Sequence, residues 1–408
     1  MILDAQGLIR SIHAAWCLDF LSRIVRFNSV GGAPGETELA RFLVGQMKGL
    51  GLEAGLQHVE GERYNAIGTW RGGGRGGRLI LNGHIDTNPV GEGWTVDPWA
   101  GLVDEKFIYG IGVSNMKAGD AAYLCAVKAL RDLGVRLRGD VVLMYVVGEL
   151  QGGIGTAKAL EEGLWGDCFL VAEPTDLAAL TMHAGAFNFI VELTGSTRHV
   201  SKREEATDAI AAACALVPRI NAAVFSGAAG AEQRSLNRAN VGVLRGSLTS
   251  EFNDTRPPQI ADFARMVGTA RYAAGQSEES VLADLRRMVC ELEREFPGLK
   301  GRVFPAQREA GRPATLPFEA PRGSRIVQAV HRAYEAVRGG PQPTGAIPPP
   351  CFFWTDAAHL RHIGKMEGVV CGPGGRYNTM PDERVDIVDY LDMVRICMMT
   401  ILDICGVE

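Results

Sequence analysis

The sequence lacks CxxC pairs, runs of basic residues and any apolar stretch of about 18 residues or more. Its nine cysteines are scattered and lie mostly among apolar residues, which is typical of buried thiols in a reducing compartment. These absences argue against a disulfide framework, a membrane span and nucleic acid as a partner, the last also because the formal net charge is -5. The first 25 residues carry charges at helical spacing, unlike a signal peptide, so we expect a cytoplasmic protein.

What the sequence has is the composition of an ordinary soluble protein. Apolar residues make up 46% and charged residues 22% of 408 residues. That length suffices for two domains of ordinary size, or for one domain that carries a large insertion.

The first half of the chain has the pattern of an α/β sheet. Residues 77–90 and 140–153 are apolar runs that end in polar residues, and residues 118–134 between them have helical apolar spacing with a glycine stop. A third apolar strand, 168–175, ends at Glu173. Strands that alternate with helices predict an α/β sheet, whose strand carboxyl ends form the ligand-binding edge.

The pattern changes near residue 184. Segments 186–195, 239–248 and 263–273 read as strands, and 207–224 and 277–296 read as helices. Antiparallel strands with two helices on one face predict a compact α+β domain. From about residue 313 the α/β pattern returns. We therefore predict a catalytic α/β domain, residues 1–183 and 313–408, interrupted by an inserted α+β domain, residues 184–312.

The glycine-rich stretch GIGVSNMKAG, residues 110–119, invites a phosphate-binding interpretation. A P-loop needs GxxxxGK followed by Ser or Thr, whereas here Lys117 follows Met116 and precedes Ala118. The spacing excludes that interpretation and leaves a loop that presents Asn115.

Six separated motifs occur in a fixed order: NGHIDTNPV, GVSNMKAG, VVGELQGG, AEPT, TRHVS and RYNTMPDE. In this order they resemble the co-catalytic zinc aminoacylase and carboxypeptidase family, which includes acetylornithine deacetylase, succinyl-diaminopimelate desuccinylase and glutamate carboxypeptidase. The resemblance covers nearly the whole chain. It implies an α/β, mixed-sheet zinc-peptidase-like catalytic domain with an inserted α+β dimerisation (lid) domain, and a homodimer formed through that domain.

The resemblance assigns four retained residues to the site. His84 and Asp86 stand in the intact GHxD motif, where residues two apart on a strand share a face, so that Asp86 can hold the His84 ring. Glu149 occupies the position of the general base, and Glu173 that of a metal ligand. His84 and Asp86 are also suited to a metal-free histidine–carboxylate pair.

Three other metal-ligand positions of the family carry different residues. The bridging aspartate is replaced by Asn115, the second glutamate of a pair by Leu150, and the C-terminal histidine by Asn378, or by Thr379 in a shifted alignment. Leucine offers no lone pair, and neutral amides are poor zinc ligands. We therefore expect no dinuclear zinc centre, and either no cofactor or a single weakly bound zinc ion on His84 and Glu173. Asn115 and Asn378 become candidates for hydrogen bonds to a substrate.

The resemblance also implies roles in the site for three residues of the inserted domain. His199 matches a lid histidine that reaches the partner subunit's site and polarises the scissile carbonyl. Arg271 matches a lid arginine that pairs with a substrate carboxylate, and Asn253 matches a substrate-contacting asparagine less closely. The expected partners are a small-molecule substrate with a carboxylate and a second copy of the chain, with no nucleic acid and no membrane.

Plainer interpretations stay open for each residue. Glu149 could be a solvated turn residue, His84 and Asp86 a structural pair, His199 a surface histidine, and Arg271 the partner of an acidic neighbour. Cys351 and Cys371 fit inert core thiols better than nucleophiles.

The residues leave three functions in order of preference. The first is an amidohydrolase-like enzyme that acts on an N-acyl amino acid or small peptide-like amide, with Glu149 as general base. The second is a metal-independent lyase, cyclase or acyl-transfer enzyme of specialised metabolism on the same scaffold. The third is a non-catalytic binding homologue.

Overall fold

The computed structural model describes residues 5–252, 256–309 and 311–408, which form two compact units. The first unit comprises the described residues up to Met182 together with Glu319–Cys351 and Thr355–Glu408. The second comprises His183–Phe318 and Phe352–Trp354. Each unit has a hydrophobic core of its own.

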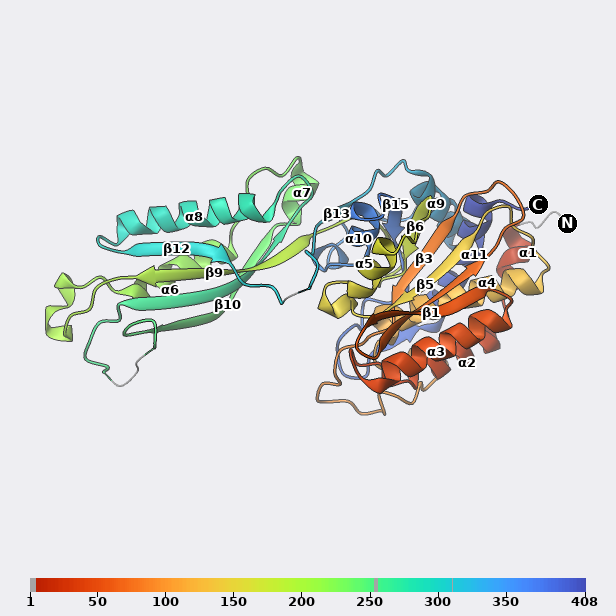
Figure 1. Ribbon diagram of the computed structural model, residues 1–408, viewed down its shortest axis with the longest axis horizontal. Helices are drawn as coiled ribbons and strands as arrows, with labels where there is room; N and C mark the ends of the chain where they lie inside the picture. Colours follow the sequence, from red (N-terminus) through yellow and green to blue (C-terminus); the bar gives the residue numbers. More distant parts are fainter. Residues whose placement is uncertain (1–4, 253–255, 310) are drawn as a thin grey trace. The chain divides into compact units, whose positions relative to one another are not determined.

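The first unit is built on a mixed eight-stranded sheet (Figure 1). Two antiparallel pairings lie at one side of it, and the pairings among β5, β3, β6 and β15 are parallel. In spatial order the strands are β1 (Glu53–Glu60), β2 (Arg63–Trp70), β5 (Val141–Val146), β3 (Leu79–His84), β6 (Cys168–Val171), β15 (Glu367–Val370), β7 (Ala179–Leu180) and β14 (Thr344–Gly345).

The central strands are buried on both faces, as their apolar runs predict. In β5, Val141, Leu143 and Tyr145 belong to the main core, whereas the alternate residues Val142 and Met144 face the opposite side of the sheet. The main core is shared with α2 (Ala14–Val25), α3 (Pro34–Gly49), α4 (Ala118–Asp132), α9 (Arg325–Arg338) and α11 (Ile387–Cys405). Two further helices, α5 (Ile154–Glu161) and α10 (Ala357–His362), contact each other and other strands of the sheet.

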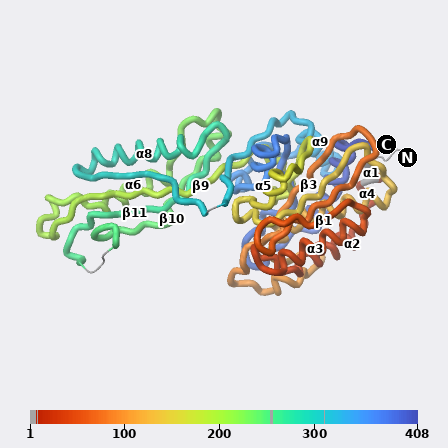
Figure 2. The backbone as a smooth tube through the Cα atoms, in the orientation of Figure 1, coloured from red at the N-terminus to blue at the C-terminus, as the bar shows by residue number. Residues whose placement is uncertain are grey.

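Helices from both ends of the sequence meet in this unit. In Figure 2 the backbone runs from α1 (Ala5–Arg10) and α2 at one end of the chain to α11 at the other, and both early helices contact α11. The Tyr390 hydroxyl of α11 donates to the main-chain oxygen of Cys17 in α2, at 2.9 Å. This long-range contact fixes the helical layer behind the sheet.

The second unit is an antiparallel four-stranded sheet with two long helices. Its strands lie in the order β10 (Arg238–Ser247), β11 (Phe263–Tyr272), β9 (Gly185–Thr194) and β12 (Lys300–Pro305). Helices α6 (Ala209–Asn221) and α8 (Glu278–Glu295) pack on each other and on this sheet. Ser277 and Ser280 form a capping box that begins α8 where its apolar spacing begins. The predicted α/β sheet with a separate α+β unit is confirmed.

The limits of the second unit differ from the predicted insertion at three places. His183, residues 313–318 and Phe352–Trp354 cluster with the second unit rather than with the α/β unit. Thr315 forms an isolated bridge with Ala186, and the Trp354 indole donates to the main-chain oxygen of Leu316 at 2.9 Å. These contacts join segments far apart in sequence, which is why composition alone misplaced the border.

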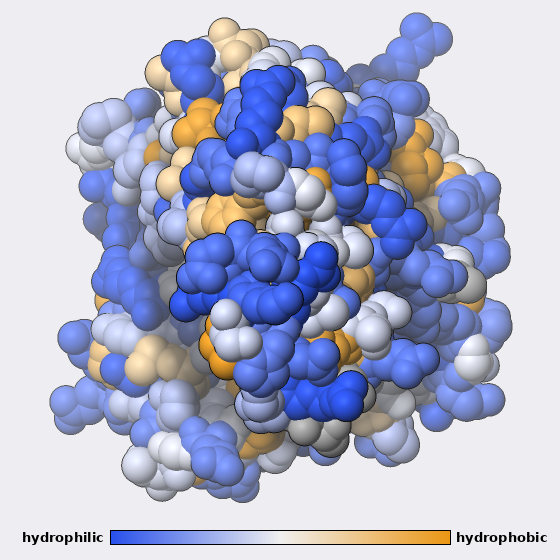
Figure 3. Space-filling model, turned by 90° about the vertical axis from the view of Figure 1, so that its left-hand side faces the viewer, coloured by the Kyte–Doolittle hydropathy of each residue, from blue (hydrophilic) through white to orange (hydrophobic). Residues whose placement is uncertain are grey.

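Hydrophilic side chains cover most of the surface drawn in Figure 3, and apolar residues there form small separate patches. Among the described residues, no helix combines the length and the apolar character that crossing a bilayer requires.

Separate cores predict that the two units unfold independently. Leu143→Ala removes a fully buried side chain from the first core and Phe189→Ala from the second, each at a cost of about 3–5 kcal/mol. In differential scanning calorimetry we expect two unfolding transitions, and each substitution should lower the midpoint temperature of a different one. A single transition that both variants lower equally would contradict this prediction.

Candidate functional site

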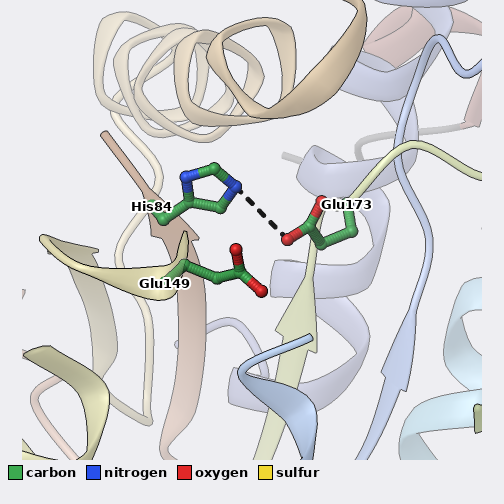
Figure 4. Close-up of side chains that lie close together, drawn as sticks. All are labelled: His84, Glu149 and Glu173. Atoms are coloured by element: carbon green, nitrogen blue, oxygen red, sulfur yellow. Dashed lines mark ion pairs between the residues drawn. The ribbon is translucent and has the colours of Figure 1, made fainter. Parts of the chain in front are cut away.

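Three neighbouring parallel strands end at one edge of the sheet and bring three ionisable side chains together. His84 ends β3, Glu149 follows β5 and Glu173 follows β6. Their ligand atoms all lie within 4.8 Å of one another, and the side chains converge on the same space in Figure 4. The cluster is buried, with His84 at 2%, Glu149 at 9% and Glu173 at 4% exposure. Burial excludes the interpretation of Glu149 as a solvated turn residue.

The His84 ring is held from both sides. Its Nδ1 lies 2.9 Å from the main-chain oxygen of Asp86 and 3.4 Å from the Asp86 carboxylate, and its Nε2 lies 3.4 Å from Glu173 Oε1. Asp86 therefore contacts the His84 ring, and the closer of its two contacts is through its main-chain carbonyl. Burial opposes a charge on the imidazole, yet Glu173 and Asp86 outweigh it and hold the pKa of His84 well above its ordinary value.

The Asp86 carboxylate instead fixes the loop that carries Glu149. It accepts hydrogen bonds from the backbone N–H groups of Gly148, Glu149 and Leu150, at 3.0, 3.3 and 3.2 Å. Burial would raise the pKa of Asp86, but the hydrogen bond and charge of His84, together with the Leu150 N–H and the charge of Arg63, lower it. The loop enters through Gly148 in the left-handed region, with φ of 76°.

A second ion pair supports the same loop from behind. Arg63 makes two 2.7 Å hydrogen bonds to the Glu36 carboxylate and one of 3.0 Å to Gln151 Oε1. The Glu36 side chain is fully buried, and a buried pair with this bidentate geometry is rigid. Sequence reasoning missed Arg63 and Glu36, because they lie 27 residues apart and belong to no motif.

Two further buried carboxyl groups also escaped the sequence analysis. Asp356, before α10, and Asp120, in α4, are 2% and 1% exposed, and their charges act on the same cluster. Burial raises the pKa of Asp356 to about 7 and that of Asp120 well above its ordinary value. An aspartate within an apolar helical pattern, as in AGDAAYLCAV, was the available signal.

Burial also raises the pKa of Glu149 well above its ordinary value, with His84 opposing the shift and Glu173 and Asp356 adding to it. A carboxylate in such surroundings accepts a proton more readily than an exposed one. The arrangement can therefore move protons.

Asn115 lies on a short π-helix, η1 (Val113–Lys117), that follows Gly112 in the left-handed region. Val113 and Met116 of this turn point into the main core, whereas Asn115 is half-buried and lines a cavity. The Glu383 carboxylate accepts the Ser114 N–H at 2.8 Å and so holds the turn. Single π-turns of this kind occur frequently at functional sites.

The cavity beside His84 has a volume of about 180 Å³. Asn115, Leu150 and Asn378, which the sequence analysis placed at three metal-ligand positions of the family, all line it, and so does Thr379. These residues were singled out from the sequence, and they line one cavity although some of them lie more than 200 positions apart in the chain.

The types of donor atom at the site determine how many metal ions these residues can bind. Among the described residues, His84, Glu149 and Glu173 form the one group of at least three imidazole, thiol or carboxylate ligands, and this set fits a single ion. The cavity side offers amide and leucine side chains, and its carboxylates Asp86 and Glu383 already accept backbone N–H groups. This donor set does not fit a second ion.

Two further predicted residues belong to the second unit. His199 is exposed in the second unit, where Ser201 Oγ lies 2.9 Å from its Nδ1, and Arg271 lies in β11 opposite Arg238 and Ala186. Asn253 falls outside the described residues. Cys351 and Cys371 are fully buried, and burial raises the pKa of Cys371 to about 12, as expected of inert thiols.

Solved structures with this architecture include peptidases. Aminopeptidase PepT from Bacillus cereus ATCC 10987 aligns with a TM-score of 0.76 at 18% identity, covering 97% of this chain and 99% of that one. The YXEP protein of Bacillus subtilis, a dinuclear metal binding peptidase from the M20 family, aligns with a TM-score of 0.64 at 16% identity, covering 96% and 98%. At these identities the likeness defines the fold class, that of the M20 peptidases.

Residues 80–403 match the Peptidase family M20/M25/M40, and the chain belongs to this family. Members of the family are hydrolases that act on amide bonds. The chain is 25% identical over 365 residues to N-formyl-4-amino-5-aminomethyl-2-methylpyrimidine deformylase of Bacillus subtilis (strain 168), covering 80% of this chain and 79% of the relative. It is 30% identical over 177 residues to acetylornithine deacetylase of Edwardsiella ictaluri (strain 93-146), covering 42% and 45%.

The loop geometry predicts unequal effects for two glycines with left-handed backbones. At Gly148 an added Cβ would lie 2.3 Å from the Ile154 side chain, whereas at Gly163 (φ of 90°) it would meet nothing within 4 Å. Gly163→Ala should cost about 1–2 kcal/mol in strain, and Gly148→Ala should cost more and displace Glu149. The midpoint temperature of thermal unfolding and the rate of amide hydrolysis of the two variants check this prediction. Equal effects of the two substitutions on both quantities would contradict it.

Proposed function

We propose that the protein hydrolyses the amide bond of an N-acyl amino acid or small peptide-like amide, with Glu149 as the general base. The observation that carries the proposal is the convergence of His84, Glu149 and Glu173 at the end of three parallel strands, beside a cavity. The deformylase and deacetylase among its relatives support a reaction in which an acyl group leaves an amine.

The proposed reaction needs water and a proton carrier. Glu149 takes a proton from the water while the water oxygen bonds to the amide carbon. Glu149 then delivers that proton to the amide nitrogen as the C–N bond breaks. The products are a carboxylic acid and an amine. The Asp86 contacts to the loop backbone keep the Glu149 carboxylate beside His84.

A metal ion, where bound, would be held by His84 and Glu173 and would supply Lewis acidity toward the carbonyl and the water. We propose one ion per chain at most, because Asn115, Leu150 and Asn378 stand where the second ion's ligands would lie. A shared carboxylate is what allows two cations about 3.5–4 Å apart to coexist, and Asn115 cannot supply it.

The same observation favours a second candidate, a metal-independent lyase, cyclase or acyl-transfer enzyme in which Glu149 and His84 move protons. Substrate-carboxylate binding by Arg271, carbonyl polarisation by His199 and homodimer formation through the second unit remain proposals that rest on the family resemblance. A non-catalytic binding protein is the third candidate.

Glu149→Gln tests the base, because the amide keeps the shape but cannot accept the proton. We expect hydrolysis of an N-acyl amino acid panel to fall about a hundredfold to ten-thousandfold. Glu161→Gln, at an exposed position after the same loop, is the matched control and should retain activity. Unchanged turnover in folded Glu149→Gln protein would remove both catalytic candidates.

Metal content tests the cofactor proposal independently of activity. We expect elemental analysis of the purified chain, after equilibration with zinc, to give no more than one ion, and Glu173→Gln to reduce that amount. Two ions per chain would overturn the proposal. Full turnover after exhaustive chelation would favour the metal-independent candidate over a zinc-dependent hydrolase.

A further inference from the structure

The cavity next to His84 has hydrogen-bonding groups that the protein itself does not use. The buried Oδ1 of Asn378 has no hydrogen-bond partner among the described residues. Asn115 lines the same cavity, and the described part of the chain gives its side-chain amide no hydrogen bond either. The Asn378 Oδ1 is enclosed by protein atoms, so a ligand N–H reaches it once the Asn378 side chain turns toward the cavity, and that hydrogen bond would satisfy an acceptor that is unpaired in the empty cavity.

The charged groups around the cavity are already neutralised or hydrogen-bonded. The Asp86 carboxylate accepts three backbone N–H groups, Glu383 accepts the Ser114 N–H, and His84 lies between Asp86 and Glu173. A cation or an anion entering the cavity would therefore lose its hydration without gaining an unpaired counter-charge. The cavity disfavours a charged group of either sign.

Apolar side chains form one part of the cavity wall. Leu150 and Met380 are 39% and 41% exposed although both line the cavity, and Trp94 and Ile111 complete this side. The loop that carries Trp94 is fixed by Asp382, which accepts the Thr95 N–H at 2.8 Å and its hydroxyl at 2.7 Å. Flat apolar walls with a few polar groups are typical of small-molecule sites.

The volume limits the size of the ligand. A cavity of roughly 150 Å³ accommodates benzene, so about 180 Å³ has room for a single ring with one small substituent. Because His84 lines the cavity and lies beside Glu149, a group bound there would place a neighbouring amide next to the cluster.

We propose that the cavity beside His84 binds an uncharged, planar, amide-bearing head group of the substrate. The chemical class is a carboxamide, a ureido group or a nitrogen heteroaromatic ring, with N–H groups for Asn378 and a wall contact with Leu150 and Met380. This inference deepens the proposed function and rests on it for the placement of the scissile bond.

An isosteric series tests the charge preference directly. Benzamide, benzoate and benzamidinium have the same shape but are neutral, anionic and cationic. In isothermal titration calorimetry with the full chain, we expect benzamide to bind at least about tenfold more tightly than either charged isostere. Equal or tighter binding of benzoate or benzamidinium would overturn the inference, as would no binding of benzamide.

Substitutions locate the binding. Asn378→Leu should weaken benzamide binding about fivefold to thirtyfold, the range expected for one lost hydrogen bond to a buried group. Asn115→Asp, which keeps the shape, should shift the preference toward benzamidinium. Asn240→Leu, at an exposed strand position of the second unit, is the matched control and should change nothing. Circular dichroism verifies that each variant folds, and unchanged benzamide affinity in both folded cavity variants would overturn the inference.

Failure of the inference and failure of the proposed function give different results. If the chain hydrolyses the N-acyl amino acid panel but does not bind benzamide, the proposed function stands and the head-group proposal is wrong. If the chain binds benzamide, Asn378→Leu weakens that binding and no amide is hydrolysed, the head-group proposal stands and the proposed hydrolase function is wrong.

Discussion

The pairing register of three parallel strands is the constraint on which the rest of the site depends. His84 pairs with Val146 of β5, and Asn82 pairs with Val171 of β6, so the residues just beyond each strand reach the same edge. A shift of one residue in β3 would turn His84 to the opposite face of the sheet. Because these strands are buried on both faces, their apolar side chains fix the register, and the core thus determines where the ionisable groups meet.

Within that frame, the balance of charge is unusual. Carboxyl groups from Asp86, Asp120, Glu149, Glu173 and Asp356 surround one imidazole, and Arg63, whose charge acts on Asp86, is paired with Glu36. Burial of so many acids is costly unless protons, a cation or hydrogen bonds offset their charge. Asp86 is stabilised by N–H groups, whereas Glu149 and Asp356 have raised pKa values. These raised pKa values suit proton exchange, and among the described residues His84, Glu149 and Glu173 are the one group of at least three imidazole, thiol or carboxylate ligands that could hold a metal ion.

The two sides of His84 consequently differ in chemistry. On one side lie two carboxylates that suit acid–base catalysis or one metal ion. On the other lie Asn115, Leu150 and Asn378, whose neutral side chains suit an uncharged organic group. The three side chains that we propose to leave no room for a second metal ion are also the ones that line this cavity. The cofactor proposal and the head-group proposal therefore depend on the same set of residues.

The sequence by itself determined the alternation of strands and helices, the α+β unit and the positions of His84, Glu149 and Glu173 at strand ends, because apolar periodicity and motif order are local properties. It also identified Asn115 and Asn378 as departures from the family pattern. Only the tertiary structure decided that these two amides and Leu150 share one cavity, that Asp86 binds the Glu149 loop rather than His84 alone, and that Asp120, Asp356 and the Glu36–Arg63 pair belong to the site. Those contacts join residues up to several hundred positions apart, and no local pattern encodes which of many buried carboxylates meet. Packing of the core fixes them, because it sets the register and the helix positions from which these side chains project.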